Sequence, residues 1–585
     1  MKKNDSNIVK DGPEMISRAY FDKVDAFYSK IAAHPFIIAF LACVLLTPLC
    51  FGAQQNITES AKMIWCLIGF SFPGVLLLLL YRKGKIQKAP AIVCSFVILV
   101  CGIFLSYGFT HSSRASLWIF FCIASAAALF RFSVMSDKER SDRHNAFMIM
   151  SISFAIKFCY VLYSSCYTRQ NDVRTFNSNA GHAGYIEYLI QNKQLPDFDP
   201  VTRWQFYHPP FHHTVSAFWI DFCENVLGAS RNFARESLQM LMLFYSVAAV
   251  IIVYKLLKYF HFKGGALLLP LALFAFHPSF ILSSGAINND QLAALLTIAT
   301  MLFTFRWFDD PTMQNIIPIA FSIGFGMMTK LNVGTIAAGV GILFVWKFAE
   351  RIKDAFKMIS QFAVFLVICV PLAFWWQIRN LILWKTPITY VPLVGGDQVI
   401  DMGIFERLTD FSGKQFSPVF ENWIRDGSSF TEYNPNIAIM KNSLFGESIN
   451  ADNFPGKNTV IPTVFFWLAL VLALIGVAAT FWMLFVKKTK LRPAQKLFFV
   501  SYWTFSMLYF YMFCSKYPAT CTQNFRYLTP LLVVTAVVYA MLLDTFKSSE
   551  KGAAKAAYKV VSGMIAAFCV LSVIVYLLVG YAEVK

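Results

Sequence analysis

Long apolar runs separated by short loops rich in Lys and Arg constrain the fold of this chain more than any other feature. A helix that crosses about 30 Å of hydrocarbon needs roughly 20 mostly apolar residues. Fifteen runs meet this requirement, at 34–53, 63–81, 90–109, 115–132, 146–166, 237–257, 266–284, 287–305, 314–329, 332–349, 358–377, 461–486, 497–514, 528–544 and 560–580. Only 14% of the 585 residues are charged, against about a quarter in soluble domains, so a water-soluble enzyme is excluded. The sequence predicts an all-α polytopic membrane protein of about 15 transmembrane helices.

The basic residues indicate the orientation of these helices. The net charge is +18, but Lys and Arg stand in short groups between apolar runs and form no basic face, so a nucleic-acid partner is not expected. With the amino terminus in the cytoplasm, the inside segments carry 31 of the 51 basic residues, as the positive-inside rule requires. This orientation places the long segments 167–236 and 378–460 outside.

The first outside segment combines several polar motifs. It contains Asn171-Asp172-Val173-Arg174 and Tyr207-His208-Pro209-Pro210, and four of the nine His residues of the chain. Between the motifs, Tyr185, Ile186, Leu189 and Ile190 recur at helical spacing, which predicts a helix in the plane of the membrane interface. A second short helix is expected to begin at the Pro pair, since proline is favoured in a first turn.

This arrangement resembles the first extracytoplasmic loop of GT-C glycosyltransferases. In particular, it is similar to the protein O-mannosyltransferases (glycosyltransferase family 39) and the bacterial aminoarabinose transferases. The resemblance implies that Asp172 is the catalytic carboxylate and that His208-Pro209-Pro210 is the second loop motif. The mannosyltransferases have Asp-Glu where this chain has Asp172-Val173, and Gly-Lys where it has His212-His213. These departures leave the sugar and the acceptor open.

The resemblance covers residues 146–545 and implies a GT-C-like bundle with added segments. We expect residues 1–145 to form an amino-terminal cytoplasmic segment with four added helices. Residues 146–377 would form the core with the catalytic loop 167–236, residues 378–460 a lid or acceptor-binding loop, and residues 461–585 the last helices.

Polar residues far apart in the sequence fall at the outer ends of the predicted spans, as a single outer-face site requires. We expect Lys330, Arg379 and Arg526 to hold the donor phosphate, because a lipid phosphate leaves as an anion that needs cations. Asp172 would accept the proton of the attacking hydroxyl in a single inverting displacement. The expected substrate-binding residues are His182, His208, His212, His213, Asn289, Asp290 and Tyr527.

Some alternatives remain open from the sequence. His208 and His212 are four residues apart, a spacing that also suits a divalent metal, although hydrogen bonding to substrate hydroxyls is favoured and no cofactor is expected. The expected partners are a lipid-linked sugar donor, membrane lipids and an acceptor that is a protein, a glycan or a glycolipid. The rivals to a glycosyltransferase are a flippase for a lipid-linked saccharide and a ligase or polymerase using lipid-pyrophosphate oligosaccharides. A bacterial plasma membrane is expected, with the endoplasmic reticulum as the alternative.

Overall fold

The computed structural model describes residues 34–51, 142–393, 399–421, 425–426, 429–430, 432–486 and 489–583. The chain divides into two compact units, residues 1–141 and 142–585. The described part of the first unit is α2 (Pro35–Phe51). The predicted spans 63–81, 90–109 and 115–132 lie outside the described residues, so the expectation of about 15 transmembrane helices is not shown.

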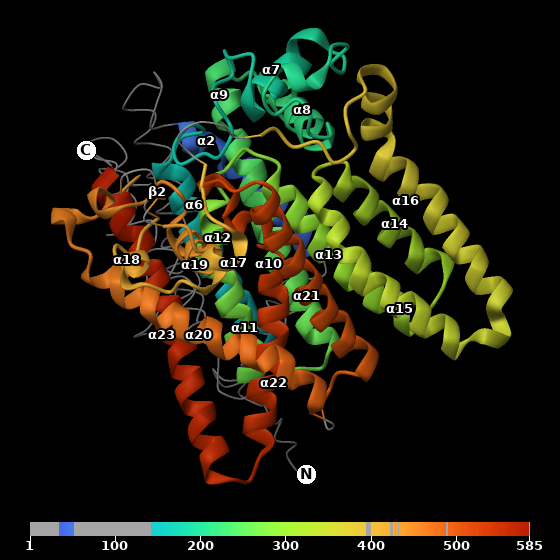
Figure 1. Cartoon of the computed structure of the whole chain (residues 1–585), viewed down its shortest axis with the longest axis vertical. Helices are drawn as coiled ribbons and strands as arrows, with labels where there is room; N and C mark the ends of the chain where they lie inside the picture. The colour runs from blue at the N-terminus through green and yellow to red at the C-terminus, as the bar shows by residue number, and fades with distance from the viewer. Residues whose placement is uncertain are drawn as a thin grey trace, which may run out of the picture. The chain divides into compact units, whose positions relative to one another are not determined.

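The second unit is a helical bundle (Figure 1). Among the described residues, nine helices are long and apolar enough to cross a membrane, which makes the protein a multi-pass membrane protein. Their principal segments are α6 (Asp142–Tyr163), α10 (Leu238–Tyr259), α13 (Asp290–Asp309), α15 (Ala337–Glu350), α16 (Ala355–Trp384), α20 (Val460–Phe485), α21 (Pro493–Lys516), α22 (Leu531–Ser548) and α23 (Gly552–Glu583). The shorter apolar helices of this unit are α11 (Gly265–Ala275) and α14 (Met313–Met327).

The predicted span 266–284 is not one helix. It breaks into α11 and α12 (Pro278–Leu282) at His277, whose backbone is extended and whose Nδ1 accepts a hydrogen bond from Ser279 N at 3.3 Å. The break follows from Pro278, because a proline disfavours helical backbone in the residue before it.

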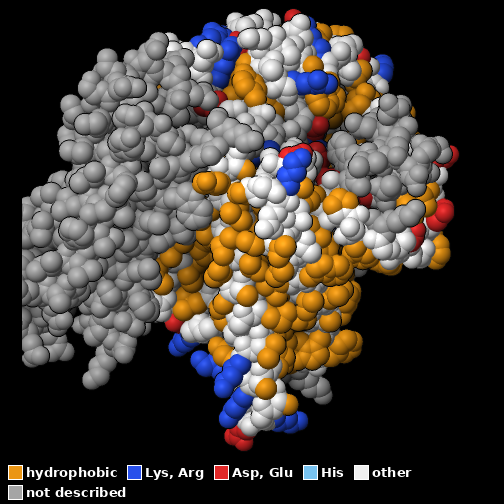
Figure 2. Space-filling model, turned by 90° about the vertical axis from the view of Figure 1, so that its left-hand side faces the viewer, with side chains coloured by type: hydrophobic (Ala, Val, Ile, Leu, Met, Phe, Trp, Pro, Cys, Tyr) orange, Lys and Arg blue, Asp and Glu red, His pale blue; other side chains and the backbone are white. Residues whose placement is uncertain are grey.

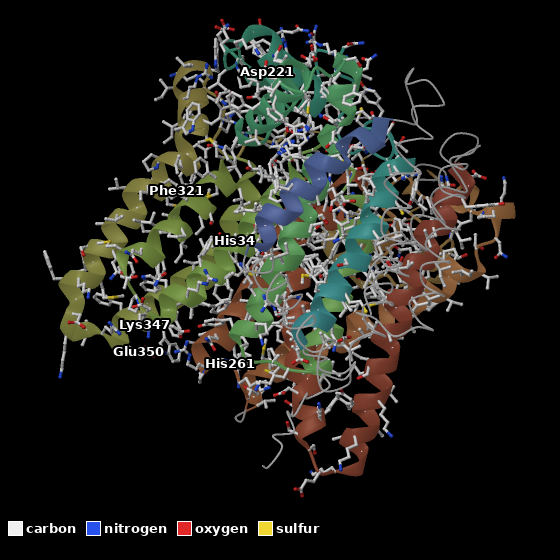
Figure 3. All side chains as sticks on the ribbon, turned by 180° about the vertical axis from the view of Figure 1, so that it is seen from behind. His34, Asp221, His261, Phe321, Lys347 and Glu350 are labelled. Atoms are coloured by element: carbon white, nitrogen blue, oxygen red, sulfur yellow. The ribbon has the colours of Figure 1, made fainter. Side chains whose placement is uncertain are left out.

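The surface and the helix ends agree with a membrane orientation. Figure 2 shows apolar side chains over the middle of one face and Lys and Arg at its lower tip. Asp309 of α13 binds both Tyr259 of α10 and Arg492, which precedes α21. Figure 3 places Lys347 and Glu350 of α15 at the end of the unit opposite Asp221. The helix ends that the charge count assigns to the cytoplasm therefore meet at one end of the bundle.

The first outside segment forms a helical cap at the other end (Figure 1). It comprises α7 (Gly181–Asn192), η1 (Pro200–Thr202), α8 (Phe211–Asn225) and α9 (Arg231–Glu236). Tyr185, Leu189 and Phe206 form its small apolar core. Both predicted loop helices are therefore present, and α8 begins directly after the Pro pair.

The second outside segment is ordered where it is described. After α16 it contains α17 (Ile404–Thr409), α18 (Gly413–Phe416), the antiparallel strands β1 (Arg425–Asp426) and β2 (Ser429–Phe430), and α19 (Pro435–Phe445), followed by η5 (Ala451–Asn453) and η6 (Pro455–Lys457). Arg407 is fully buried and donates to Tyr433 O at 3.1 Å, Cys514 O at 2.9 Å and Gln523 Oε1 at 3.1 Å. Arg407 therefore joins the second outside segment to the carboxyl-terminal end of α21 by hydrogen bonds.

The orientation can be tested with Gln194→Cys and Lys551→Cys, two exposed positions at opposite ends of the bundle. In intact cells, a membrane-impermeant maleimide should label the cysteine at position 194 and should reach the one at 551 only after permeabilisation, because the loop 167–236 is predicted to lie outside. The reverse pattern would overturn the topology and the outer-face site with it.

Candidate active site

Asp172 lies in a loop that the start of α7 holds by its backbone. His182 N donates to Asp172 O at 3.1 Å, and Ala183 N donates to Val173 O at 3.0 Å. Gly181 has φ +79°, and a Cβ there would lie 2.3 Å from Val173 O, so only glycine fits this close approach. Asp172 itself has φ +61°, a left-handed conformation that Asp and Asn tolerate better than most residues. The first loop therefore fixes the direction of this carboxylate.

Four alternating charges meet at the outer ends of the bundle. Arg526 Nη2 lies 2.7 Å from Asp172 Oδ2, and Arg526 Nη1 lies 3.7 Å from Asp290 Oδ2. Asp290 also forms an ion pair with Lys330. The side chains of Lys330, Asp290 and Arg526 are 10–13% exposed, and that of Asp172 is 29% exposed. We call these four residues the charge cluster.

Short loops hold the members of the charge cluster in place. Asp290 N donates to Asn288 Oδ1 at 3.1 Å, and Asn289 Nδ2 donates to Thr329 O at 3.1 Å, next to Lys330. Arg526 lies in η8 (Phe525–Tyr527), where its backbone N donates to Asn524 Oδ1 at 2.9 Å. Asn289 thus joins two loops and lies fully buried beside the cluster.

A cavity of about 310 Å³ opens beside the charge cluster. Asp172, Lys330 and Tyr527 line its polar side. Its apolar side consists of residues of α14, α16, α21 and the loops next to them, including Met327, Leu331, Phe374, Tyr509, Phe510 and Phe513. On α16 and α21, side chains such as Val367 (73% exposed) and Met512 (70% exposed) face outward from the bundle. The cavity therefore has charged groups on one side and apolar side chains on another, and it lies within the bundle.

The four predicted histidines stand together, but only two reach this cavity. His182 and His208 line it, whereas His212 and His213 are fully buried beneath, and His182 Nδ1 lies 2.9 Å from His213 Nε2. Burial lowers the pKa of His208 to about 3 and that of His212 to about 4. These imidazoles are therefore neutral near pH 7, and they can exchange hydrogen bonds with hydroxyls but cannot hold a phosphate by charge.

The geometry does not favour a metal at His208 and His212. The helix α8 begins at Phe211, after His208, so the two side chains do not share a helical face as the spacing suggested. In the part of the chain that the structure describes, no three His, Cys, Asp or Glu side chains are grouped to hold a metal ion.

Arg379 is not brought to the charge cluster. Its guanidinium donates to Pro196 O at 2.6 Å and to Asn380 Oδ1 at 3.1 Å, and it lies over the Trp376 ring at 5.0 Å. This arginine joins the end of α16 to the first outside loop, next to the cavity but outside its lining.

Sequence reasoning missed three residues next to Arg526. Asn442 of α19 accepts from Phe525 N at 2.7 Å and donates to Gln523 O at 2.8 Å, and Glu447 accepts from Asn524 Nδ2. Gln291, directly after Asp290, is 1% exposed. No sequence signal pointed to Asn442 and Glu447, because they lie in a long segment without periodicity. Gln291 is a polar residue in a predicted apolar run, which is the one signal in the sequence that sets it apart.

One comparison with known protein families gives a match. Residues 209–375 match the family described as dolichyl-phosphate-mannose-protein mannosyltransferase. This stretch runs from the Pro pair into α16 and contains Asp290 and Lys330, whereas Asp172 and Arg526 lie outside it. None of the curated proteins compared with the chain matches it.

The match identifies the class of the protein as a membrane glycosyltransferase that uses a sugar linked to a polyprenyl phosphate. The matched family is the mannosyltransferase family that the loop motifs resemble, and the resemblance is confirmed over residues 209–375.

Glu187 has a structural position that its place in the sequence did not suggest. Its side chain is 6% exposed and binds Arg231 and Arg235, the latter at 3.0 Å. Glu187→Gln should weaken hydrogen bonds to charged groups that are worth about 1.5–3 kcal/mol each. We expect a lower melting temperature in detergent and near-normal turnover per folded molecule. A large loss of turnover at an unchanged melting temperature would contradict this assignment.

Proposed function

We propose that the protein moves a sugar from a polyprenyl-phosphate donor to an acceptor hydroxyl on the extracytoplasmic face by a single inverting displacement. The observation that carries the proposal is a cavity beside the charge cluster, with Asp172 and Lys330 on one side and apolar side chains on another. A bacterial plasma membrane is the proposed location. The family match supports the lipid-linked donor, and the mechanism rests on the geometry of Asp172, Lys330 and Arg526.

The cavity suits the donor because its two kinds of wall match the two parts of a lipid phosphate. Lys330 and the neighbouring Arg526 would bind the phosphate, the arginine through two parallel hydrogen bonds and the lysine as a point charge. The aromatic residues of α21 would contact the first part of the polyprenyl chain. The same cations would stabilise the phosphate as it leaves, so no general acid is needed at the leaving oxygen.

Asp172 suits the role of the base because its loop fixes it beside these cations. Its carboxylate faces Arg526 at 2.7 Å, so a phosphate that binds Arg526 competes with Asp172 for the guanidinium. In the proposed reaction, Asp172 takes the proton of the acceptor hydroxyl, the hydroxyl oxygen forms the new bond to the anomeric carbon, and the lipid phosphate leaves with the electron pair. His182 and His208, which are neutral, would hydrogen-bond sugar hydroxyls.

Asp172→Asn tests the base directly. The substitution keeps the size of the side chain and suits the positive φ of the loop, so the protein should fold and bind the donor lipid. Turnover should fall about 10²–10⁴-fold, the usual contribution of a general base. Sugar transfer by purified protein from polyprenyl-phosphate mannose, glucose and aminoarabinose would measure this. Asp197→Asn, an exposed carboxylate of the same outside segment, is the control and should be near normal. Near-normal transfer by Asp172→Asn would exclude it as the base.

The double variant Lys330→Gln/Asp290→Asn tests the phosphate site while leaving no buried charge unpaired. Loss of one charge-assisted hydrogen bond to the phosphate, about 1.5–3 kcal/mol, should raise the KM for the donor roughly ten- to hundredfold. The matched control is Lys441→Gln/Glu432→Gln, which neutralises a buried pair at 2.5 Å in the second outside segment. The control should leave the donor KM unchanged. An unchanged donor KM in the Lys330 double variant would remove this lysine from the phosphate site.

A further inference from the structure

A second, smaller cavity lies on the other side of the charge cluster. Its volume is about 70 Å³, and Asp290 and Arg526 line it, whereas Asp172 and Lys330 line the larger cavity. The Arg526–Asp172 ion pair therefore links the walls of the two cavities. Most of the other lining residues are polar, and the lining comes mainly from the loop after α6, α12 and the residues after it, the start of α13, the end of α19 and the turn before η8.

Gln291 makes this cavity unusual. The residue lines the cavity and is 1% exposed, and neither its Oε1 nor its Nε2 has a hydrogen-bond partner among the residues that the structure describes. A buried amide without partners is rare, because leaving such a group unpaired costs about 1–3 kcal/mol. The sequence therefore retains a cost in stability at a residue that lines this cavity.

Glu447 adds an acceptor to the same cavity. Its carboxylate lines the wall near Arg526 and accepts from Asn524, the residue that caps the backbone of Arg526. Burial raises the pKa of Glu447, and the Arg526 guanidinium opposes this effect. The cavity thus presents an amide that can donate and accept beside a carboxyl group that can accept.

We propose that this cavity is a hydroxyl-binding subsite in which Gln291 and Glu447 hold a hydroxyl group of a substrate beside the Arg526–Asp172 ion pair. The inference rests on the proposed function and specifies which residues bind a hydroxyl group of the substrate. Positive and negative side chains are balanced in the lining, so neither an anion nor a cation is favoured. A volume of about 70 Å³ holds roughly two groups of the size of water, each of about 30 Å³, which fits one edge of a sugar or a single alcohol.

Gln291→Met separates this role from a structural one. Methionine keeps the length and removes both polar atoms, and removal of an unpaired buried amide should leave stability unchanged or raised. We expect an equal or higher melting temperature together with transfer reduced about three- to tenfold, the effect of one lost hydrogen bond. Gln495→Met is the matched control. Gln495 is a buried glutamine at the opposite end of the bundle that accepts from Arg492 N at 2.9 Å, so its loss should lower the melting temperature and spare transfer.

Glu447→Gln tests the second residue of the subsite. Glutamine can still accept from Asn524, so the turn that carries Arg526 stays in place while the carboxylate is lost. Transfer should fall at least as much as in Gln291→Met, with an unchanged inhibition constant for polyprenyl phosphate, the product that competes with the donor. A rise in that inhibition constant would show instead that Glu447 acts only by positioning Arg526, and would overturn its place in the subsite.

Two probes identify the source of the hydroxyl. If it belongs to the donor sugar, Gln291→Met should weaken binding of the polyprenyl-phosphate sugar that the wild type uses and leave binding of polyprenyl phosphate unchanged. If it belongs to the acceptor, both lipids should bind normally and only transfer should fall. Normal transfer by Gln291→Met, with the wild type active, would overturn the subsite alone. A wild type that transfers no sugar from any of the three donors would contradict the proposed function and the subsite together.

Discussion

The ion pair between Arg526 and Asp172 is the interaction on which the arrangement of the outer face depends. It joins the first outside loop to the turn before α22, two segments more than 350 positions apart in the sequence. Each partner is held separately, Asp172 by the backbone of α7 and Arg526 by Asn524 and the Asn442 of α19. Both outside segments therefore converge on one bond, and a displacement of either segment changes the geometry of the proposed base and the proposed phosphate ligand together.

The membrane explains why this cluster lies at the ends of the helices. A charge at the centre of a span costs about 2.5–3.5 kcal/mol on insertion scales, and polar backbone must be paired within the bilayer. Loops at helix ends avoid both penalties, and they can carry Asp172, Lys330 and Arg526 next to apolar walls. A lipid donor needs this boundary, since its phosphate and its polyprenyl chain require different surroundings within a few ångströms.

Apolar periodicity and charge asymmetry were enough to predict the bundle, because both are direct consequences of the bilayer. The structure has a helix in every predicted span from residue 146 onward, except that Pro278 divides the span 266–284 into two helices. The same reasoning placed Asp172, Asp290, Lys330 and Arg526 at one face, but it also included Arg379, which is directed at Pro196 instead. The position of a residue along a predicted helix indicates its depth in the membrane, but it does not indicate the direction in which its side chain points. Glu187, Glu447 and Gln291 escaped notice for the same reason, since their roles depend on partners distant in sequence.

The balance of charge in the cluster links donor binding to catalysis on the proposed mechanism. Two cations and two carboxylates leave it neutral without substrate, and Arg526 holds the carboxylate of Asp172 in an ion pair. A lipid phosphate that takes over the guanidinium would release the carboxylate of Asp172 from this ion pair, so that its oxygen could accept the proton of the acceptor hydroxyl. The carboxylate would then be available as a base only when the leaving group is in place. Such an order would also limit the activation of water in place of the acceptor, because Asp172 is paired with Arg526 while no substrate is bound.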